Sequence, residues 1–457
     1  MTPGSPFASL LAALAAALLS AAPVLTPLAG PAALAPGNPV TAEAVAAPSP
    51  DARALASAVD AALDASPGRV AAQVRDAATG EVLHARDADF LAAPASSLKV
   101  LTAAAALRTL GPERTLRTRV VAVPAADDGA TELVLVGGGD VLLGDGASDP
   151  DAVAGRAGLR TLAERTVAGL AEAGVSGDVV VSVDLRLFDG AAVNPAWTPD
   201  LLEDGHVSAV QPLATWGGRE VPGVDEERIE DPAGHAALVF QRLLDEEIER
   251  TGADLDLGLR DSIPATTAVR DDVVAAEPTA QVESAPVAEV AAYMLAHSEN
   301  QVAEALGHLS AYAVGRPATH EGAADLLEDV FADLGADTAG MAVLDASGLA
   351  EGSRVSPAQL AAVVSAASRV PWLAPVLDGL PRPGEDSTLD ERFRGTAAEG
   401  AVAAKTGTLD HTVSLTGTVT TQDGRVLAFS IVASDLDWRL DEAREAVDAA
   451  VTAMAGL

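Results

Sequence analysis

The chain has 457 residues, enough for two or more domains, and a hydrophobic content of 49% can supply sizeable cores. Asp and Glu number 66 against 29 Lys and Arg, the formal net charge is -37, and aromatic residues make up only 3%. This composition excludes nucleic-acid binding, because an acidic surface repels phosphate, and the absence of Cys excludes thiol catalysis, disulfides and Cys-ligated zinc.

The first predicted element is an apolar, Ala/Leu-rich stretch from Phe7 to Ala22 that is followed by prolines. It is short for a membrane span and suits the apolar core of a signal peptide. The usual basic segment is missing, because the first cation of the chain is Arg53. We expect residues 1–35 to be an export signal or N-terminal anchor, residues 36–50 to be a Pro/Ala linker, and the protein to be exported to the extracytoplasmic, cell-wall side.

Three local structures are predicted next in the chain. Residues 51–65 have the periodicity of an amphipathic helix. Two alternating runs on either side of Ala78-Thr79-Gly80 predict a β-hairpin. Residues 96–110 form a strong helical segment that opens after Pro94 and ends at Gly111-Pro112.

The composition changes between about residues 116 and 275. Short Val-rich runs alternate with Gly/Asp turns and one or two helical stretches, which predicts a separate α+β insert. Helical patterns return from about residue 276. The insert therefore separates an early segment, 51–115, from a late one, 276–457.

The end of the chain has three strand-like runs at 401–408, 412–420 and 425–434, followed by a helix at 441–454. The turn residues Gln422-Asp423-Gly424 join the last two strands. We predict an antiparallel sheet built from both ends of the chain, with a helical cluster beside it.

Only two lysines occur in the chain, Lys99 and Lys405, and all other side-chain cations apart from histidine are arginines. An ammonium group can lose its proton at an accessible pH, whereas a guanidinium cannot. Lysine is therefore expected where a base, a proton relay or a compact cation is required.

Lys99 closes the motif Ser96-Ser97-Leu98-Lys99. Ser96 and Lys99 are three residues apart, so on a helix they share one face. A partly buried lysine with a lowered pKa can take the proton of a serine hydroxyl and make it a nucleophile. At a helix N-terminus the serine amide is also free to donate to an oxyanion.

Ser298-Glu299-Asn300 lies in a predicted helical stretch. Ser298 offers a second hydroxyl for proton relay, and Asn300 offers an amide that can hold a substrate carbonyl or the lysine side chain. The alternative interpretation of this motif alone is a Ser-x-Asn on a helix surface.

Lys405-Thr406-Gly407-Thr408 lies on a predicted strand, where a cation and hydroxyls can bind a terminal carboxylate. Gly407 would let a ligand approach the strand edge. A phosphate-binding loop is excluded, because Glu399 and Ala404 stand where that motif needs glycines.

In this order, Ser-x-x-Lys, Ser-x-Asn and Lys-Thr-Gly resemble the three signatures of the penicillin-interacting serine enzymes. The long separation of Ser96 from Ser298 is unlike class A β-lactamases. It is similar to the D-alanyl-D-alanine carboxypeptidase/endopeptidase family, the class C low-molecular-weight penicillin-binding proteins of peptidase family S13, which carry extra domains there. Further stretches that resemble this family are 133–140, 183–190, 283–300, 344–357 and 388–396.

The resemblance implies an α/β (α+β) penicillin-binding/β-lactamase-like transpeptidase domain, with an antiparallel sheet, helices and an inserted α+β domain. It implies hydrolysis of peptidoglycan stem peptides through an acyl-enzyme on Ser96, binding of β-lactams, and no cofactor or metal. Lys99 would be the general base and Ser298 a proton relay, and the amides of Ser96 and Thr408 would form the oxyanion hole. Substrate-binding roles fall on Asn300, Lys405, Thr406, Gly407 and Thr408.

Three positions depart from the family pattern. Ala346 and Ser387 stand where Gly is expected, and Ser353 stands where Asn is common. The first two are expected to shift loops, and the third to weaken a contact near the site.

Two alternatives stay open from the residues. One is a β-lactamase or esterase on the same scaffold, although no E-x-x-L-N stretch is present. The other is a non-catalytic wall-binding protein of the same fold. A zinc peptidase is excluded, because His320-Glu321 has no second histidine at the required spacing. The sequence leaves open the balance of carboxypeptidase and endopeptidase action, the oligomeric state, and any association with membrane or cell wall.

Overall fold

The computed structural model describes residues 50–457 except 126–128, 224–226 and 269. The predicted export segment, 1–35, and the linker up to residue 49 lie outside the described residues. Within the described part, no single helix is long and apolar enough to cross a membrane. One bent pair of helices reaches the required length and composition, with a bend of 107° between Pro357–Ala367 and Pro371–Asp378.

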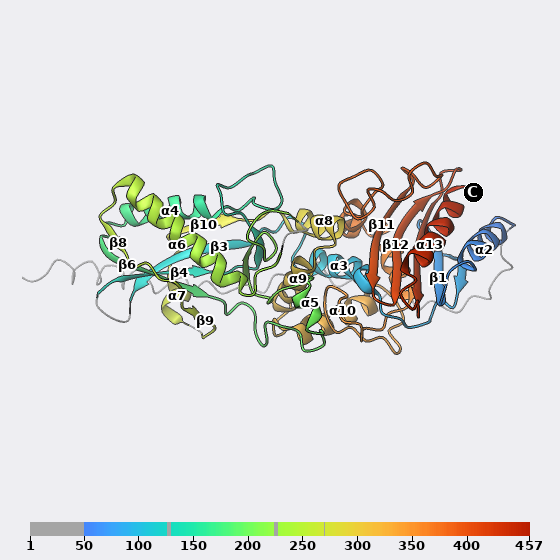
Figure 1. The fold of residues 1–457 in the computed structure, drawn as a ribbon, viewed down its shortest axis with the longest axis horizontal. Coiled ribbons are helices and arrows are strands. Elements are labelled where there is room, and N and C mark those ends of the chain that lie inside the picture. Colours follow the sequence, from blue (N-terminus) through green and yellow to red (C-terminus); the bar gives the residue numbers. More distant parts are fainter. Residues whose placement is uncertain (1–49, 126–128, 224–226, 269) are drawn as a thin grey trace, which may run out of the picture. The chain divides into compact units, whose positions relative to one another are not determined.

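Both ends of the described chain build one five-stranded antiparallel sheet, as predicted (Figure 1). The strand order is β11-β12-β13-β1-β2, so β11 is an edge strand. The strands are β1 (Arg69–Asp76), β2 (Val82–Arg86), β11 (Val402–Leu409), β12 (Thr412–Thr420) and β13 (Val426–Ser434). The predicted hairpins at 78–80 and 422–424 both form.

Helices cover both faces of this sheet. On one face, α2 (Pro50–Leu63) and α13 (Leu440–Ala455) pack against each other and share a core with the sheet that includes Phe429. On the other face, α11 (Pro357–Ala367) contacts β1 and β13. The strands are accordingly almost continuously buried, as expected for a sheet covered on both faces.

The predicted segment 96–110 consists of a 3₁₀ turn, η1 (Ala95–Leu98), followed by α3 (Lys99–Thr109). Its Ala-rich sequence favours helix, and small side chains let neighbouring helices approach. Residues 99–107 are all buried, so α3 lies inside the helical cluster and contacts α8, α9, α10 and α11. The other members are α8 (Val287–His297), α9 (Asn300–Ala313), α10 (His320–Asp333), η2 (Pro371–Leu373) and α12 (Ala374–Asp378).

The insert contains a mixed sheet of order β10-β3-β4-β6-β8, with β9 paired to β6. Its strands are β3 (Arg117–Pro124), β4 (Thr131–Val136), β6 (Gly177–Asp184), β8 (Leu255–Leu257), β9 (Ala265–Thr266) and β10 (Ala280–Glu283). The Val-rich runs form its central strands, because β-branched residues suit a buried sheet. β10 lies beyond residue 275 and still pairs with β3, so the sheet extends past the predicted end of the insert.

Two helices, α4 (Leu159–Glu172) and α6 (Pro232–Thr251), share a core with one face of this sheet, and the short α7 (Asp271–Ala275) packs on the other. A separate parallel pair, β5 (Asp140–Leu143) with β7 (Leu213–Thr215), and the short helix α5 (Asp200–Glu203) complete the insert. β5 also contacts α9, which carries part of the second motif.

Candidate active site

Ser96 lies in the 3₁₀ turn that precedes α3, and this turn is fixed to the sheet. The Ser97 hydroxyl is hydrogen bonded to that of Ser414 on β12 at 2.8 Å, and Ser414 donates to the carbonyl oxygen of Pro94, also at 2.8 Å. Ala95 has a left-handed φ of 49°, which is uncommon for a residue with a side chain. Such strain persists only where the surroundings enforce it, and it often marks a functional site.

Lys99 is fully buried, and its Nζ atom connects the first two motifs. It donates to Ser96 Oγ at 2.8 Å, to Asn300 Oδ1 at 2.6 Å and to the carbonyl oxygen of Ser347 at 2.7 Å. All three ammonium protons are therefore used, and the lysine is held against the predicted nucleophile.

Burial lowers the pKa of the Lys99 ammonium to about 8, although nearby carboxylates, first Asp345, partly oppose this shift. A pKa near the working pH gives a useful population of the neutral amine. At pH 7 about one molecule in ten carries it. Lys99 can therefore accept a proton from Ser96 without leaving its place.

Ser298 and Asn300 lie at the break between α8 and α9, and not within one helix. Ser298 ends α8 with a left-handed φ of 55°, and Asn300 is the first residue of α9. Asn300 Oδ1 accepts from Lys99, which leaves its Nδ2 to donate to the carbonyl oxygen of His206 at 2.9 Å. Within the described part of the chain the Ser298 hydroxyl makes no hydrogen bond.

Glu299, between these two residues, points away from them and ties the second motif to the insert. It is fully buried and forms ion pairs with Arg219 and Arg228, at 2.8 Å and 2.5 Å. Despite burial, the two guanidinium groups hold the pKa of Glu299 below its usual range. Segments of the insert thus hold the second motif in place.

A loop at residues 345–350 supports Lys99 from the opposite side. Glu304 Oε1 accepts hydrogen bonds from the amides of Ala346 and Ser347, at 3.0 Å and 2.8 Å. This orients the Ser347 carbonyl toward Lys99. Gly348, with φ of 84°, is required there, because a Cβ would lie 2.0 Å from the carbonyl oxygen of Ala95.

The departures from the family pattern are accommodated locally. A Cβ on Gly307 of α9 would lie 2.6 Å from the Ala346 methyl group, so the absence of a side chain at Gly307 leaves room for Ala346. Ser353 is buried and its hydroxyl accepts from the Leu344 amide at 3.2 Å, so it supports this loop. The Ser387 hydroxyl accepts from the Leu389 amide within its own turn.

The third motif lies on edge strand β11, beside the Ser96 turn. Lys405 is fully buried, and its Nζ donates to the carbonyl oxygen of Thr406 at 2.8 Å. The Thr406 hydroxyl donates to that of Thr388 at 3.0 Å, and Thr408 is exposed. Burial, together with repulsion from Lys99, holds the pKa of Lys405 well below its usual range. Among the described residues no carboxylate is paired with Lys405.

Gly407 brings β11 close to Ser96. A Cβ at this position would lie 2.2 Å from Ser414 Oγ and 3.0 Å from the Ser96 amide nitrogen. We expect Gly407→Ala to push the strand away and to slow acylation of Ser96 by benzylpenicillin about 10- to 100-fold, the equivalent of an overpacking cost of about 1–3 kcal/mol. The rate is measured by mass spectrometry. Gly146→Ala is the control, because nothing lies within 4 Å of that added carbon, and equal rates in both variants would contradict the role.

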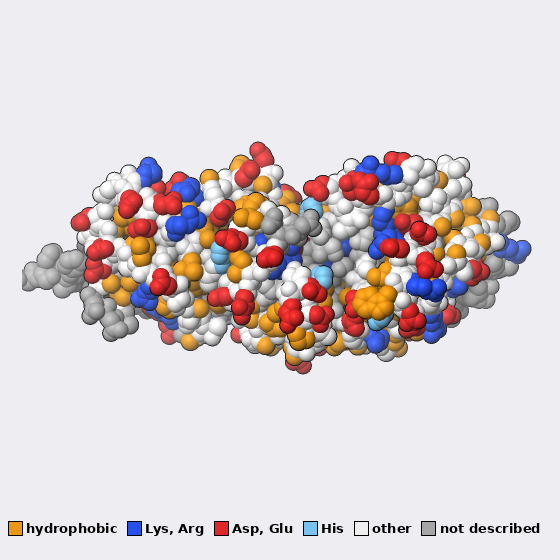
Figure 2. Space-filling model, viewed as in Figure 1, with side chains coloured by type: hydrophobic (Ala, Val, Ile, Leu, Met, Phe, Trp, Pro, Cys, Tyr) orange, Lys and Arg blue, Asp and Glu red, His pale blue; other side chains and the backbone are white. Residues whose placement is uncertain are grey.

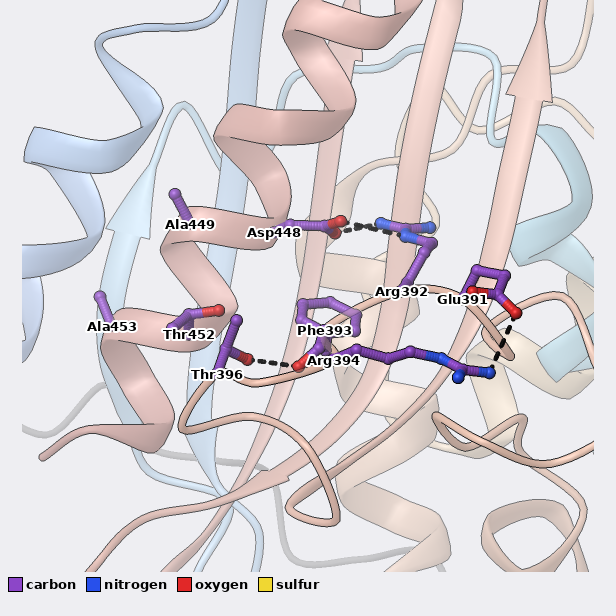
Figure 3. A pocket seen from close by; sticks show the side chains of 9 residues that line it. All are labelled: Glu391, Arg392, Phe393, Arg394, Thr396, Asp448, Ala449, Thr452 and Ala453. Atoms are coloured by element: carbon purple, nitrogen blue, oxygen red, sulfur yellow. Dashed lines mark hydrogen bonds and ion pairs between the residues drawn. The ribbon is translucent and has the colours of Figure 1, made fainter.

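A pocket of about 630 Å³ lies elsewhere, between the segment 391–396 and α13 (Figure 3). None of its lining residues belongs to the three motifs, and its charged groups are paired, as in Arg392–Asp448. We therefore do not consider it the active site. Figure 2 shows Asp and Glu scattered over the displayed face with arginines among them, so the acidic charge forms no single patch there.

The structure thus brings together residues of all three predicted motifs. Ser96, Lys99 and Asn300 are directly hydrogen bonded, Gly407 lies against Ser96, and Lys405 is close enough to Lys99 to lower its own pKa. Six residues that hold the three motifs in place were not predicted, because the spacing of residues in a sequence does not reveal contacts between distant segments. These are Arg219, Arg228, Glu299, Glu304, Ser347 and Ser414.

An antiparallel sheet lies beside a helical cluster, a serine lies in the turn before a helix that begins with a buried lysine, and a Lys-Thr-Gly strand lies next to them. This arrangement defines the class of penicillin-interacting serine enzymes. Residues 55–233 and 227–455 match the D-Ala-D-Ala carboxypeptidase 3 (S13) family. The chain belongs to this family, and the family and enzyme class predicted from the motifs are confirmed.

Relatives of known name agree with this assignment. The chain is 34% identical over 432 residues to carboxypeptidase Rv3627c of Mycobacterium tuberculosis, covering 91% of this chain and 88% of the relative. It is 30% identical over 422 residues to a D-alanyl-D-alanine carboxypeptidase of an Actinomadura species, covering 79% and 76%. The fold is shared with penicillin-binding protein 4 of Haemophilus influenzae, at a TM-score of 0.63 and 18% identity, covering 83% of this chain and 93% of that one. This likeness confirms the predicted fold class.

Proposed function

We propose that the chain is an exported serine-type D-Ala-D-Ala carboxypeptidase/endopeptidase that cleaves peptidoglycan stem peptides through an acyl-enzyme on Ser96. The observation that carries this proposal is the contact of a fully buried lysine with both Ser96 Oγ and Asn300 Oδ1. The activities named for the mycobacterial and Actinomadura relatives support the same substrate class.

In the acylation step, neutral Lys99 takes the Ser96 proton while Oγ attacks the carbonyl carbon of the penultimate D-Ala. The amides of Ser96 and Thr408 donate to the developing oxyanion. The C–N bond then breaks, and the departing amine receives a proton by way of Lys99 and Ser298. Water hydrolyses the resulting ester, which frees Ser96 and completes the peptidase cycle.

Lys405 supplies the positive charge for the terminal carboxylate of the substrate. A second buried cation so close to Lys99 is unfavourable without an anion, as its lowered pKa indicates. A bound carboxylate offsets the charge of Lys405, with Thr406 and Thr408 as additional donors. The same groups would bind the carboxylate of a β-lactam, which makes benzylpenicillin a suitable probe.

The test is intact-protein mass spectrometry after incubation with benzylpenicillin. We expect a stable adduct on the wild-type chain and none on Ser96→Ala, because the Ser96 hydroxyl is the one hydrogen bonded to Lys99 Nζ among the described residues. Ser97→Ala is the matched control, since Ser97 is the neighbouring hydroxyl and bonds only to Ser414. An adduct that persists in Ser96→Ala would contradict the assignment of the nucleophile.

The two alternatives give different results in the same experiment. A β-lactamase would leave no adduct and consume the drug rapidly, and a non-catalytic wall-binding protein would give neither adduct nor turnover.

The proposal that the protein is exported rests on the apolar stretch from Phe7 to Ala22. It is tested by cell fractionation, in which a purely cytoplasmic protein would contradict it.

A further inference from the structure

A buried group of two histidines and a glutamate lies behind the active site, outside the three motifs. Glu304 and His308 are on α9, and His320 is the first residue of α10. Their potential ligand atoms all lie within 4.8 Å of one another, and the three side chains are almost fully buried. The i, i+4 spacing places Glu304 and His308 on one face of their helix.

The separation of two potential ligand atoms in this group matches that in a tetrahedral metal site. Two ligand atoms, each about 2.1 Å from a zinc ion, are about 3.4 Å apart. Glu304 Oε2 and His320 Nδ1 are separated by 3.3 Å, which is long for a charge-assisted hydrogen bond and matches that ligand spacing. The His308 ligand atom lies within 4.8 Å of both of these atoms.

The surrounding hydrogen bonds orient these groups as metal ligands are usually oriented. Nδ1 of His308 lies 2.9 Å from the carbonyl oxygen of Glu304, so the ring donates there and keeps the lone pair on Nε2. Both backbone amides bound to Glu304 use Oε1, which leaves Oε2 for a metal.

Packing alone does not account for the cluster. The rings of His308 and His320 do stack in the core, against Phe188 and Trp197 at 4.9 Å and 5.2 Å. However, His320 Nδ1 faces the buried Glu304 carboxylate, so a ring nitrogen and a carboxylate oxygen meet inside the core, where one cation would bind both.

We infer that Glu304, His308 and His320 bind one Zn²⁺ ion. Two imidazoles and one carboxylate form a ligand set that zinc accepts, with water as the fourth ligand. No metal site was predicted from the sequence, because no second histidine lies at the required spacing from His320-Glu321. His308 comes instead from the preceding helix, α9. The inferred role is positional. Glu304 holds the amide of Ser347, whose carbonyl oxygen accepts from Lys99.

The test is zinc binding by the full chain, purified without a metal-binding tag, loaded with Zn²⁺ and dialysed against metal-free buffer. We expect about one Zn²⁺ per chain by plasma mass spectrometry and a higher melting temperature after loading. Co²⁺ should replace zinc and give the visible absorption of a four-coordinate site. A wild-type chain that keeps no zinc and shows no such absorption overturns the inference.

Two variants locate the ion. His308→Gln and His320→Phe should each lower the retained zinc at least about tenfold, while His235→Gln on α6 should not. Zinc retained by both variants, or lost equally in His235→Gln, would place the ion elsewhere and overturn the assignment. Acylation by benzylpenicillin is followed on the same samples. A chain that is acylated but binds no zinc overturns this inference alone, and a chain that binds zinc but is not acylated overturns the proposed function alone.

Discussion

Replacing Lys99 by Arg is expected to abolish acylation by benzylpenicillin, with a rate loss of about 1000-fold or more. The guanidinium keeps the positive charge but cannot give up a proton, so Ser96 loses its base. The rate is followed by mass spectrometry at a fixed drug concentration. Lys99→Met, which removes the charge and is similar in length, should lose activity to the same degree.

The two substitutions separate the role of the base from that of the charge. Because Lys99 is fully buried, melting temperatures of both variants are needed to establish that they fold. Acylation of folded Lys99→Arg at the wild-type rate would exclude a proton-accepting role. Restored activity in Lys99→Arg but not in Lys99→Met would indicate that only the positive charge matters.

The wild-type enzyme offers a test that needs no substitution. Because burial lowers the pKa of Lys99 to about 8, the share of neutral amine grows as the pH rises through that value. The acylation rate should therefore rise with pH and reach half its maximum near pH 8. It should be low below about pH 6.5, where almost all Lys99 carries its proton. A flat profile between about pH 6 and 9 would contradict this mechanism.

The parts of the site that could be predicted from sequence are those in which local spacing carries the chemistry. Ser96 and Lys99 are three residues apart across a 3₁₀ turn and the start of α3, and Lys405 to Thr408 follow each other on one strand. The strand-like apolar runs and the turn at 422–424 likewise predicted the final hairpin. In each case a short segment contains the whole signal.

Contacts between distant segments could not be predicted in this way. No role was predicted for Glu299, the middle residue of the second motif. It nevertheless links that motif to Arg219 and Arg228, which lie 70 to 80 residues earlier in the chain. The left-handed conformation of Ser298 also went unpredicted, because the local sequence favours a continuous helix and tertiary contacts impose the break. The same holds for His308 and His320, which the packing of α9 on α10 brings together.

The second large effect is expected at Glu299. Glu299→Gln keeps the size and shape of the side chain but removes its charge, which takes from the buried guanidinium groups of Arg219 and Arg228 the carboxylate that both of them contact. Removing one partner of a buried ion pair typically costs about 3–5 kcal/mol. We expect the melting temperature to fall by about 4–6 °C, measured by differential scanning calorimetry.

A surface pair provides the control for this substitution. Glu246 is paired with Arg160 at 3.0 Å, but both side chains are more than 40% exposed, so Glu246→Gln should change the melting temperature by only about 1–2 °C. Equal shifts in the two variants would show that burial of the Glu299 pairs contributes nothing to stability.

The pH dependence of the Glu299 effect identifies its origin. The two arginines hold the pKa of Glu299 in the folded protein below its unfolded value, so its stabilising contribution is present above that unfolded value and is lost as the pH falls through the lowered one. The difference in stability between wild type and Glu299→Gln should therefore be large at pH 7 and become smaller at acidic pH.

Because Asn300 directly follows Glu299 and holds Lys99, acylation of the variant should also slow at temperatures where it is still folded. Slower acylation together with the loss of stability would establish that the insert supports the active site through this ion pair, whereas a stability loss with an unchanged acylation rate would limit Glu299 to holding the fold.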